Sequence, residues 1–333
     1  MTSHNQLSTP AASANIVGVS KASDSKPKLK DSFISHFSRR ATTWRHLASF
    51  ISVILMLASL TVIGVKGFNW GLDFTGGVVT EIQLDSAITA SEITPLLSSA
   101  YQQDVTVIAA GEPGRWVLRY ADTHVAGDTA PELTTVLAPL ASEVNLLNSS
   151  IVGPQVGQEL AEQGGLALLV AMVCILGYLS YRFEWRLASG ALFALLHDVI
   201  FVLAFFALTQ MEFNLTVLAA VLAILGYSLN DSIIIADRIR ELLIAKPRWA
   251  VQQINNKAIA ATFSRTMVTS GTTLMTVGAL WMMGGAPLQG FAIAMFIGIV
   301  TGTWSSISVG ATLPEFLGLK PEHYQPKPID DAP

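Results

Sequence analysis

The chain has 333 residues, of which 51% are hydrophobic and only 13% are charged, and its net charge is −4. Soluble domains usually carry about 25% charged residues, so this composition predicts a membrane protein. We expect the chain to have no enzymatic activity and to bind no cofactor, metal or nucleic acid. It has one cysteine, its basic residues flank apolar runs, and it contains no nucleotide-binding or catalytic motif.

The N-terminal segment, residues 1–45, is predicted to be cytoplasmic and largely disordered, since residues 1–30 are rich in Ser, Ala, Lys and Pro. The apolar run Leu47–Val65 follows and predicts a first transmembrane helix within residues 46–66. This run starts too late and is too long for a cleaved signal peptide, and it lacks a small-residue exit. We therefore interpret it as an uncleaved anchor.

About 95 residues separate the first apolar run from the second, and they are predicted to fold as an α/β domain over residues 67–160. Residues 78–84 alternate in polarity as a half-buried strand does. Thr89 and Glu92 predict a capping box at the start of a helix. The remaining segments predict strands and a second helix, at Val105–Ala109, Trp116–Tyr120, Pro131–Leu140 (the helix) and Val144–Val152. The resulting order, βαββαβ, is a ferredoxin-like pattern.

Five further apolar runs predict a five-helix transmembrane bundle over residues 161–313, which gives six transmembrane helices in all. Residues 314–333 are predicted to form a cytoplasmic tail. The polar start of the fifth run leaves its boundary the least certain. The six runs are Leu47–Val65, Gly164–Tyr181, Leu187–Thr209, Phe213–Ile235, Thr266–Met283 and Leu288–Leu313.

The distribution of Lys and Arg predicts the orientation of the chain in the membrane. Of 20 such residues, only Lys66, Arg115 and Arg119 lie in the segments on the side opposite the N-terminus. Because basic residues collect on the cytoplasmic side, both termini are predicted to be cytoplasmic and the α/β domain to lie outside.

Asn230 and Asp231 interrupt the fourth apolar run, where a carboxylate costs about 3 kcal/mol on insertion scales. Arg265 begins the fifth helix, and counting at about 1.5 Å per residue places it at the depth of Asp231. We therefore expect the two side chains to pair. The pair could be a static salt bridge that fixes helix register, or a carboxylate whose protonation the arginine gates.

Two other polar features within the predicted helices have alternative interpretations. Thr269 and Thr272 belong to a hydroxyl face on the fifth helix, which either satisfies backbone carbonyls or lines a hydrated path. His197 and Asp198, in the middle of the third helix, predict either a proton relay or a satisfied interhelical hydrogen bond. The charges around Asp237 are interpreted as an interfacial cluster.

Several motifs, in order over roughly residues 45–315, resemble the SecD/SecF family of bacterial protein-export subunits, and the fourth-helix motif resembles its SecF branch. They are GLDFTGG at 71–77, VGPQVGQEL at 152–160, YRFEWRLASGALFALLHD at 181–198, GYSLNDSIIIADRIRE at 226–241, SRTMVTSGTTLM at 264–275 and GGAPLQGF at 284–291. Motif residues with an expected structural role are Gly71, Asp73, Gly76, Gly77, Asp237, Arg238 and Arg240.

The resemblance implies half of a transporter of the RND superfamily in the bacterial inner membrane, working with SecD, with the SecYEG channel and functionally with SecA. Such a subunit helps the proton gradient to drive export of unfolded polypeptides. The proton-pathway positions of the family correspond to Asp231 and Arg265, and Asn230, His197, Asp198, Thr269 and Thr272 are candidate supporting residues. Two alternatives remain: an RND-type half-transporter for lipids or small molecules, and a purely structural translocon subunit.

Overall fold

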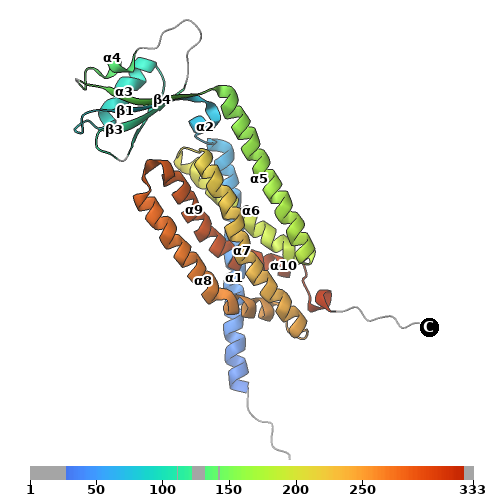
Figure 1. Cartoon of the computed structure of the whole chain (residues 1–333). Helices are drawn as coiled ribbons and strands as arrows, with labels where there is room; N and C mark the ends of the chain where they lie inside the picture. The colour runs from blue at the N-terminus through green and yellow to red at the C-terminus, as the bar shows by residue number, and fades with distance from the viewer. Residues whose placement is uncertain (1–27, 111, 122–131, 142, 326–333) are drawn as a thin grey trace, which may run out of the picture.

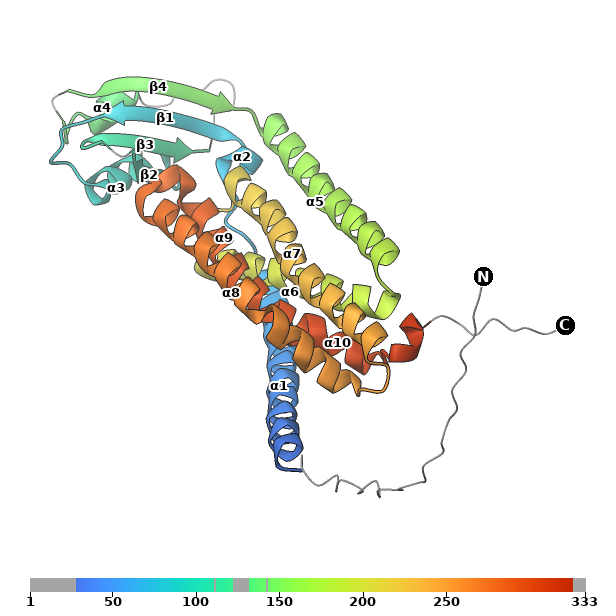
Figure 2. The ribbon, with the colours of Figure 1, turned by 60° about the horizontal axis from the view of Figure 1, so that its bottom comes forward.

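A computed structural model describes residues 28–110, 112–121, 132–141 and 143–325 of the chain. A small α/β domain stands at one end of a bundle of long helices, and the N-terminal helix α1 extends beyond the opposite end of the bundle (Figure 1). The predictions for residues 1–27, Pro131 and residues 326–333 lie outside the described residues. The two parts meet at α2 and at the start of α5, where the chain passes between them (Figure 2).

The bundle consists of long helices followed by a short C-terminal one. Five helices are long and apolar enough to cross a membrane, with spans at Arg40–Lys66, Gln155–Arg182, Trp185–Thr209, Leu215–Ala245 and Pro287–Phe316. The helices are α1 (Lys28–Lys66), α5 (Pro154–Arg182), α6 (Trp185–Thr209), α7 (Leu215–Ala245), α8 (Val251–Met283), α9 (Gly285–Ser305) and α10 (Ala311–Phe316). Helix α8 is long enough at 33 residues, but its threonines make it less apolar, and it is not among the five.

Helices α1 and α7 are two of the helices that run well beyond the apolar segments that predicted them. Helix α1 begins at Lys28, although residues up to 45 were predicted to be largely disordered; no proline or glycine interrupts residues 28–63. Helix α7 continues to Ala245, beyond the predicted end near Asp237. Charged residues in these extensions are good helix formers, so the end of an apolar run does not mark the end of a helix.

The α/β domain, called the outer domain from here on, is a four-stranded antiparallel sheet with two helices packed against one face. The sheet order is β2-β3-β1-β4, so β1 lies in the interior and β4 at an edge. Its buried core includes Ile82, Ile93, Leu97, Leu118 and Leu137. In chain order the elements are β1 (Gly77–Gln83), α3 (Ala90–Tyr101), β2 (Thr106–Ala109), β3 (Arg115–Tyr120), α4 (Leu133–Leu137) and β4 (Asn145–Val152).

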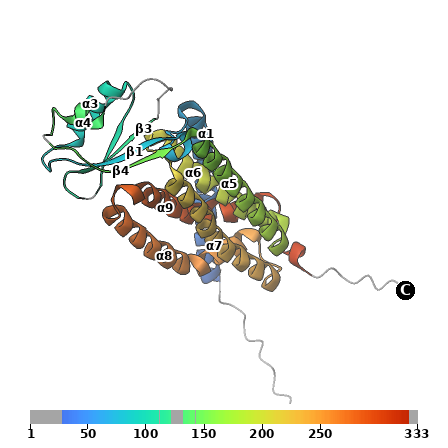
Figure 3. The same ribbon diagram turned by 45° about the horizontal axis from the view of Figure 1, so that its top comes forward.

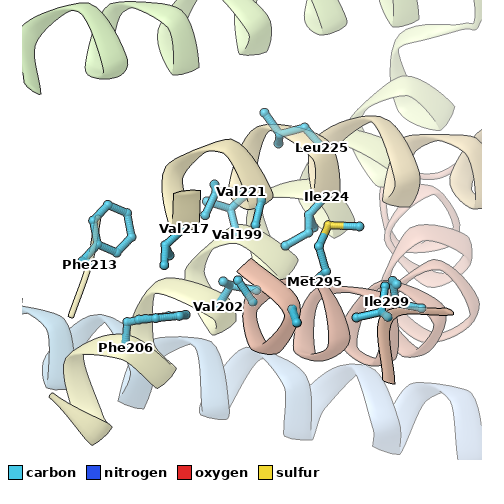
Figure 4. Packing of buried hydrophobic residues seen from close by; sticks show 14 of the residues in the cluster. Val199, Val202, Phe206, Phe213, Val217, Val221, Ile224, Leu225, Met295 and Ile299 are labelled. Carbon is cyan, nitrogen blue, oxygen red and sulfur yellow. The ribbon is translucent and has the colours of Figure 1, made fainter. Parts of the chain in front are cut away.

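The core of the bundle lies where α6, α7 and α9 cross, as the close-up in Figure 4 shows. Phe206, Val217 and Ile224 are all buried there. A side chain at Gly298 would collide with Ile224, so glycine lets α9 approach α7 closely. Figure 3 shows α7 in front of α6 and beside α9, at the centre of the bundle. Helix α7 is therefore the central helix of this core.

A short π-helix, Ser306–Gly310, separates α9 from α10. Its wider turn leaves the Ser308 carbonyl to accept a hydrogen bond from Ser49 Oγ of α1, at 2.9 Å. Gly190 of α6 packs directly against the Gly310 carbonyl. The π-helix thus makes a point of contact between α9 and two other helices, as π-bulges at functional sites often do.

Candidate functional site

Asp231 is buried on α7, with a relative exposure of 1%. Ser270 of α8 is a neighbour of Asp231, and Ser270 Oγ lies 2.8 Å from Thr303 Oγ1 of α9. Asp231 Oδ2 is buried and has no hydrogen-bond partner among the residues that the structure describes. A carboxylate with one unpartnered oxygen in a buried setting is costly as an anion.

Arg265 does not form the predicted ion pair with Asp231 within the described part of the chain. Its side chain is exposed. The reason is register: Asp231 is level with Ser270, five residues or about 7.5 Å further along α8 than Arg265. Depth counting from predicted helix ends could not resolve this offset.

The hydroxyl face of α8 mostly satisfies its own backbone. Thr269 Oγ1 donates to the Arg265 carbonyl at 3.0 Å, and Thr272 Oγ1 donates to the Val268 carbonyl at 2.9 Å. Ser270 and Thr266 instead lie buried toward the bundle, and Thr266 Oγ1 has no partner among the described residues. Helix α8 therefore presents Thr266 and Ser270 to the bundle interior, while Thr272 is exposed. Asn230 is also exposed and takes no part in this site.

Asp198 of α6 is the centre of a second buried polar cluster, which lies between α6, α7 and α9. His197 Nδ1 lies 3.0 Å from Asp198 Oδ1. Ser228 of α7 donates to Asp198 Oδ2, and Ser305 of α9 donates to the same oxygen at 3.0 Å. Both carboxylate oxygens thus have partners, and the hydrogen bonds join three helices. Sequence reasoning identified His197 and Asp198 but had no signal for the two serines, which lie far away in the chain.

The charges on the last turns of α7 form local ion pairs. Arg182, at the end of α5, pairs with Asp237 at 2.6 Å. Arg238 pairs with Glu241 one turn further on, at 2.5 Å. The Arg240 guanidinium lies 6.0 Å from the ring centre of Tyr324. These contacts hold the helix ends together, consistent with an interfacial cluster.

The glycine-rich segment at residues 71–77 joins the outer domain to the bundle. A side chain at Gly71 would come within 2.7 Å of Glu212 Oε1. Gly76 and Gly77 have positive φ angles of 73° and 146°, which side chains rarely adopt. Between Gly71 and Gly76, the four-residue helix α2 (Leu72–Thr75) carries Asp73, whose carboxylate accepts a hydrogen bond from the backbone N–H of Leu215 at 3.0 Å.

A third buried cluster, at the opposite end of the bundle, was missed by sequence reasoning. Arg45 Nη2 of α1 lies 2.5 Å from Glu315 Oε2 of α10, and both side chains are less than 10% exposed. Asn255 of α8 donates to the Ala311 carbonyl at 2.9 Å. The only signal in the sequence was that Glu315 is the single acidic residue near the end of the last apolar run. Among the described residues, no cluster of His, Cys, Asp and Glu could hold a metal ion.

Comparison with known proteins identifies the family. Residues 132–320 match the family model described as protein export membrane protein SecD/SecF, C-terminal, and residues 61–88 match the SecD/SecF GG motif. The chain belongs to the SecD/SecF family. Within this family it is 41% identical to the protein translocase subunit SecF of Vibrio alginolyticus, over 86% of this chain and 92% of that protein. It is 40% identical to the subunit of the same name from Escherichia coli O157:H7, over 84% of this chain and 88% of that protein.

A solved SecD/SecF-family structure is also similar. The crystal structure of SecDF from Thermus thermophilus, described as a translocon-associated membrane protein, matches with a TM-score of 0.73 and 30% identity over 83% of this chain. This chain spans only 38% of that SecDF chain. A SecDF structure in a super-membrane-facing form matches with a TM-score of 0.63 and 32% identity, over 81% of this chain and 37% of that one.

Proposed function

We propose that this chain is an accessory subunit of the Sec protein translocase that works with a SecD partner. Its similarity to SecF subunits over most of their length supports this role. The SecDF chain from Thermus thermophilus is more than twice the length that this chain matches, which favours a second, SecD-type half supplied by a partner. Such a partner would also cover exposed apolar helix faces such as those of α1 and α5.

The subunit would cross the bacterial inner membrane six times, with α8 as the sixth span beside the five more apolar helices. The packing of α8 against α7 and α9 through Thr266 and Ser270 supports this, because a helix next to buried polar groups needs fewer apolar residues. The βαββαβ domain would be ferredoxin-like and periplasmic, and both termini cytoplasmic, as the distribution of basic residues favours.

The work of the subunit would be to couple the proton gradient to the export of unfolded polypeptides. A proton that crosses the membrane supplies about 2.3 kcal/mol per 100 mV. That energy is useful only if protonation changes a packed contact. Burial of Asp231 between α7 and α8, with one oxygen unsatisfied, is the observation that carries this proposal. Proton transfer at Asp231 would change its interaction with Ser270 and its attraction to Arg265.

The partners would be SecD, the SecYEG channel, SecA functionally, and the exported chain. The outer domain would contact the unfolded polypeptide, and no nucleic acid, cofactor or catalytic activity is part of the proposal. The RND superfamily supplies the architectural parallel, with this chain as one half.

The test is preprotein export into sealed inverted vesicles supplied with ATP, with and without a proton gradient. Asp231→Asn should abolish the gradient-dependent gain while leaving the complex assembled, because asparagine fixes an uncharged side chain of the same size. Asn230→Ala, at the exposed neighbouring position, is the matched control and should retain the gain. If Asp231→Asn retained full gradient-dependent export, the proton-coupling role would be wrong and the chain would be a purely structural subunit.

A further inference from the structure

The outer end of α7 is capped by two side chains from different parts of the chain. Asn214 Oδ1 accepts a hydrogen bond from the N–H of Val217 at 3.1 Å, as an N-cap residue does. Asp73 Oδ2 accepts from the N–H of Leu215 at 3.0 Å. A carboxylate at a helix N-terminus also interacts favourably with the helix dipole. The second cap therefore comes from the outer domain side of the molecule, 142 residues away in the chain.

Backbone bonds and aromatic rings close the same joint. The N–H of Gly71 donates to the Phe213 carbonyl at 2.9 Å, and the N–H of Phe213 donates to the Asn69 carbonyl at 2.8 Å. The ring of Phe213 packs against Trp70 and Phe74. These contacts fix the chain before α7 to the segment that leads into the outer domain.

The far side of the joint is connected directly to the interior of the sheet. Only Gly76 separates helix α2 from Gly77, the first residue of β1, and β1 lies between β3 and β4. Arg119 of β3 pairs with Glu212, just before α7, at 2.7 Å. A displacement of the outer end of α7 would therefore be transmitted to the neighbouring strands β1 and β3.

The near side of the joint reaches Asp231 through a single continuous helix. Leu215 and Asp231 are 16 residues apart on α7, which corresponds to about 24 Å along the axis. No proline interrupts these residues, and α7 runs as one rod in Figure 2. A change of packing at Asp231 that shifts α7 would therefore move its capped end as well.

We propose that Asp73 is a positioning residue that couples α7 to the outer domain, so that a change at Asp231 is transmitted to the sheet through the α7 cap. This inference rests on the proposed function, because it gives the route by which protonation of Asp231 would act on the domain that meets the exported chain. Asp73 itself carries no proton in the transfer; it acts by holding the α7 terminus.

The experiment measures the orientation of the outer domain in the full chain assembled with its SecD-type partner. Spin labels are placed at Ser99→Cys on α3 and Thr209→Cys at the end of α6, both exposed positions, after Cys174→Ala removes the native thiol. Double electron–electron resonance should show that Asp231→Asn shifts the distance between the labels. The shift should become markedly smaller in Asp73→Ala, in which the other contacts of the joint remain, and should persist in full in Asp73→Asn, because an asparagine oxygen still caps the helix.

Glu112→Gln is the matched control, since it removes an exposed outer-domain carboxylate that is remote in sequence from residues 71–77, and the shift should persist. A shift of unchanged size in Asp73→Ala, or no shift with Asp73 intact, would overturn the coupling proposal. The proposed function is tested separately by export. If Asp231→Asn retained gradient-dependent export while the distance still shifted through Asp73, proton coupling would fail and the mechanical link would stand.

Discussion

The Arg45 guanidinium and the Glu315 carboxylate form a buried ion pair that joins the first helix to the last, with 2.5 Å between Nη2 and Oε2. Removing one member of such a pair leaves an uncompensated charge and typically costs about 3–5 kcal/mol. We expect Glu315→Ala to lower the free energy of unfolding by this amount, measured by denaturant unfolding in detergent. Replacing both residues, as Arg45→Met with Glu315→Leu, should cost much less. A double variant as unstable as the single one would contradict this account.

We expect Asp198 to hold α6, α7 and α9 together through hydrogen bonds rather than to carry a proton. Asp198→Asn keeps an acceptor and the side-chain size, and the serine hydroxyls can rotate to match it, so gradient-dependent export should be retained. Asp198→Ala leaves buried donors without an acceptor, at about 1–3 kcal/mol each, and should lower thermal stability and assembly. Loss of export in a well-assembled Asp198→Asn variant would show a relay instead.

We expect Arg265, which is exposed on α8, to act on Asp231 by charge without forming an ion pair with it. Arg265→Lys keeps the charge but loses the planar fork, so we expect a few-fold reduction of gradient-dependent export in sealed vesicles. Arg265→Ala should reduce it further, to the level of Asp231→Asn. Thr272→Ala, on the exposed face of the same helix, is the control. Equal activity of the alanine variant and the parent chain would remove Arg265 from the pathway.

Membrane orientation can be tested at Pro247, in the segment between α7 and α8. After Cys174→Ala, Pro247→Cys should be labelled by an impermeant maleimide only when the inner face of the membrane is accessible. Ser99→Cys in the outer domain should show the opposite pattern. Labelling of residue 247 from outside intact cells would reverse the predicted topology.

The outer domain should fold on its own as a fragment over residues 70–155. This fragment should also lose the helix-capping interaction of Glu92 when the pH is lowered. Glu92 Oε2 accepts from the N–H of Thr89 at 2.9 Å, and this bond lowers the pKa of Glu92. A lowered pKa contributes stability that is present above the unfolded value, about 4.3, and is lost as the pH falls through the folded value. The advantage of the parent fragment over Glu92→Gln should therefore shrink below about pH 4. Amide shifts typical of a disordered chain would contradict independent folding.

Local patterns predicted the parts of the molecule in which neighbours in sequence decide the structure. The period-two alternation before Leu84 and the Thr89–Glu92 cap lie in β1 and at the start of α3. Burial of Asp231 followed from a carboxylate within an apolar run. The pairing with Arg265 was not correct, because contacts between helices depend on an offset of a few residues that no helix end reveals.

Contacts between distant segments had no local signal at all. Glu315 and Arg45 each resemble an interfacial charge at the end of an apolar run, and only the assembled bundle brings them together. The Asp73 cap is similar: the sequence shows a glycine-rich motif, but not that its carboxylate reaches the N-terminus of a helix 142 residues later.

The π-helix at Ser306–Gly310 sets the rotational phase of everything that follows it. Each α-helical residue turns the chain by roughly 100°, since a turn contains 3.6 residues. Rewinding this segment as regular α-helix at its present length would turn Glu315 by nearly that angle, away from Arg45, whereas deleting one residue along with the π-turn would leave Glu315 close to its present phase. The π-turn therefore absorbs one extra residue, so that natural variation here can include the loss of a single residue together with the π-turn, while length changes of two or three residues would misalign Glu315 and Arg45.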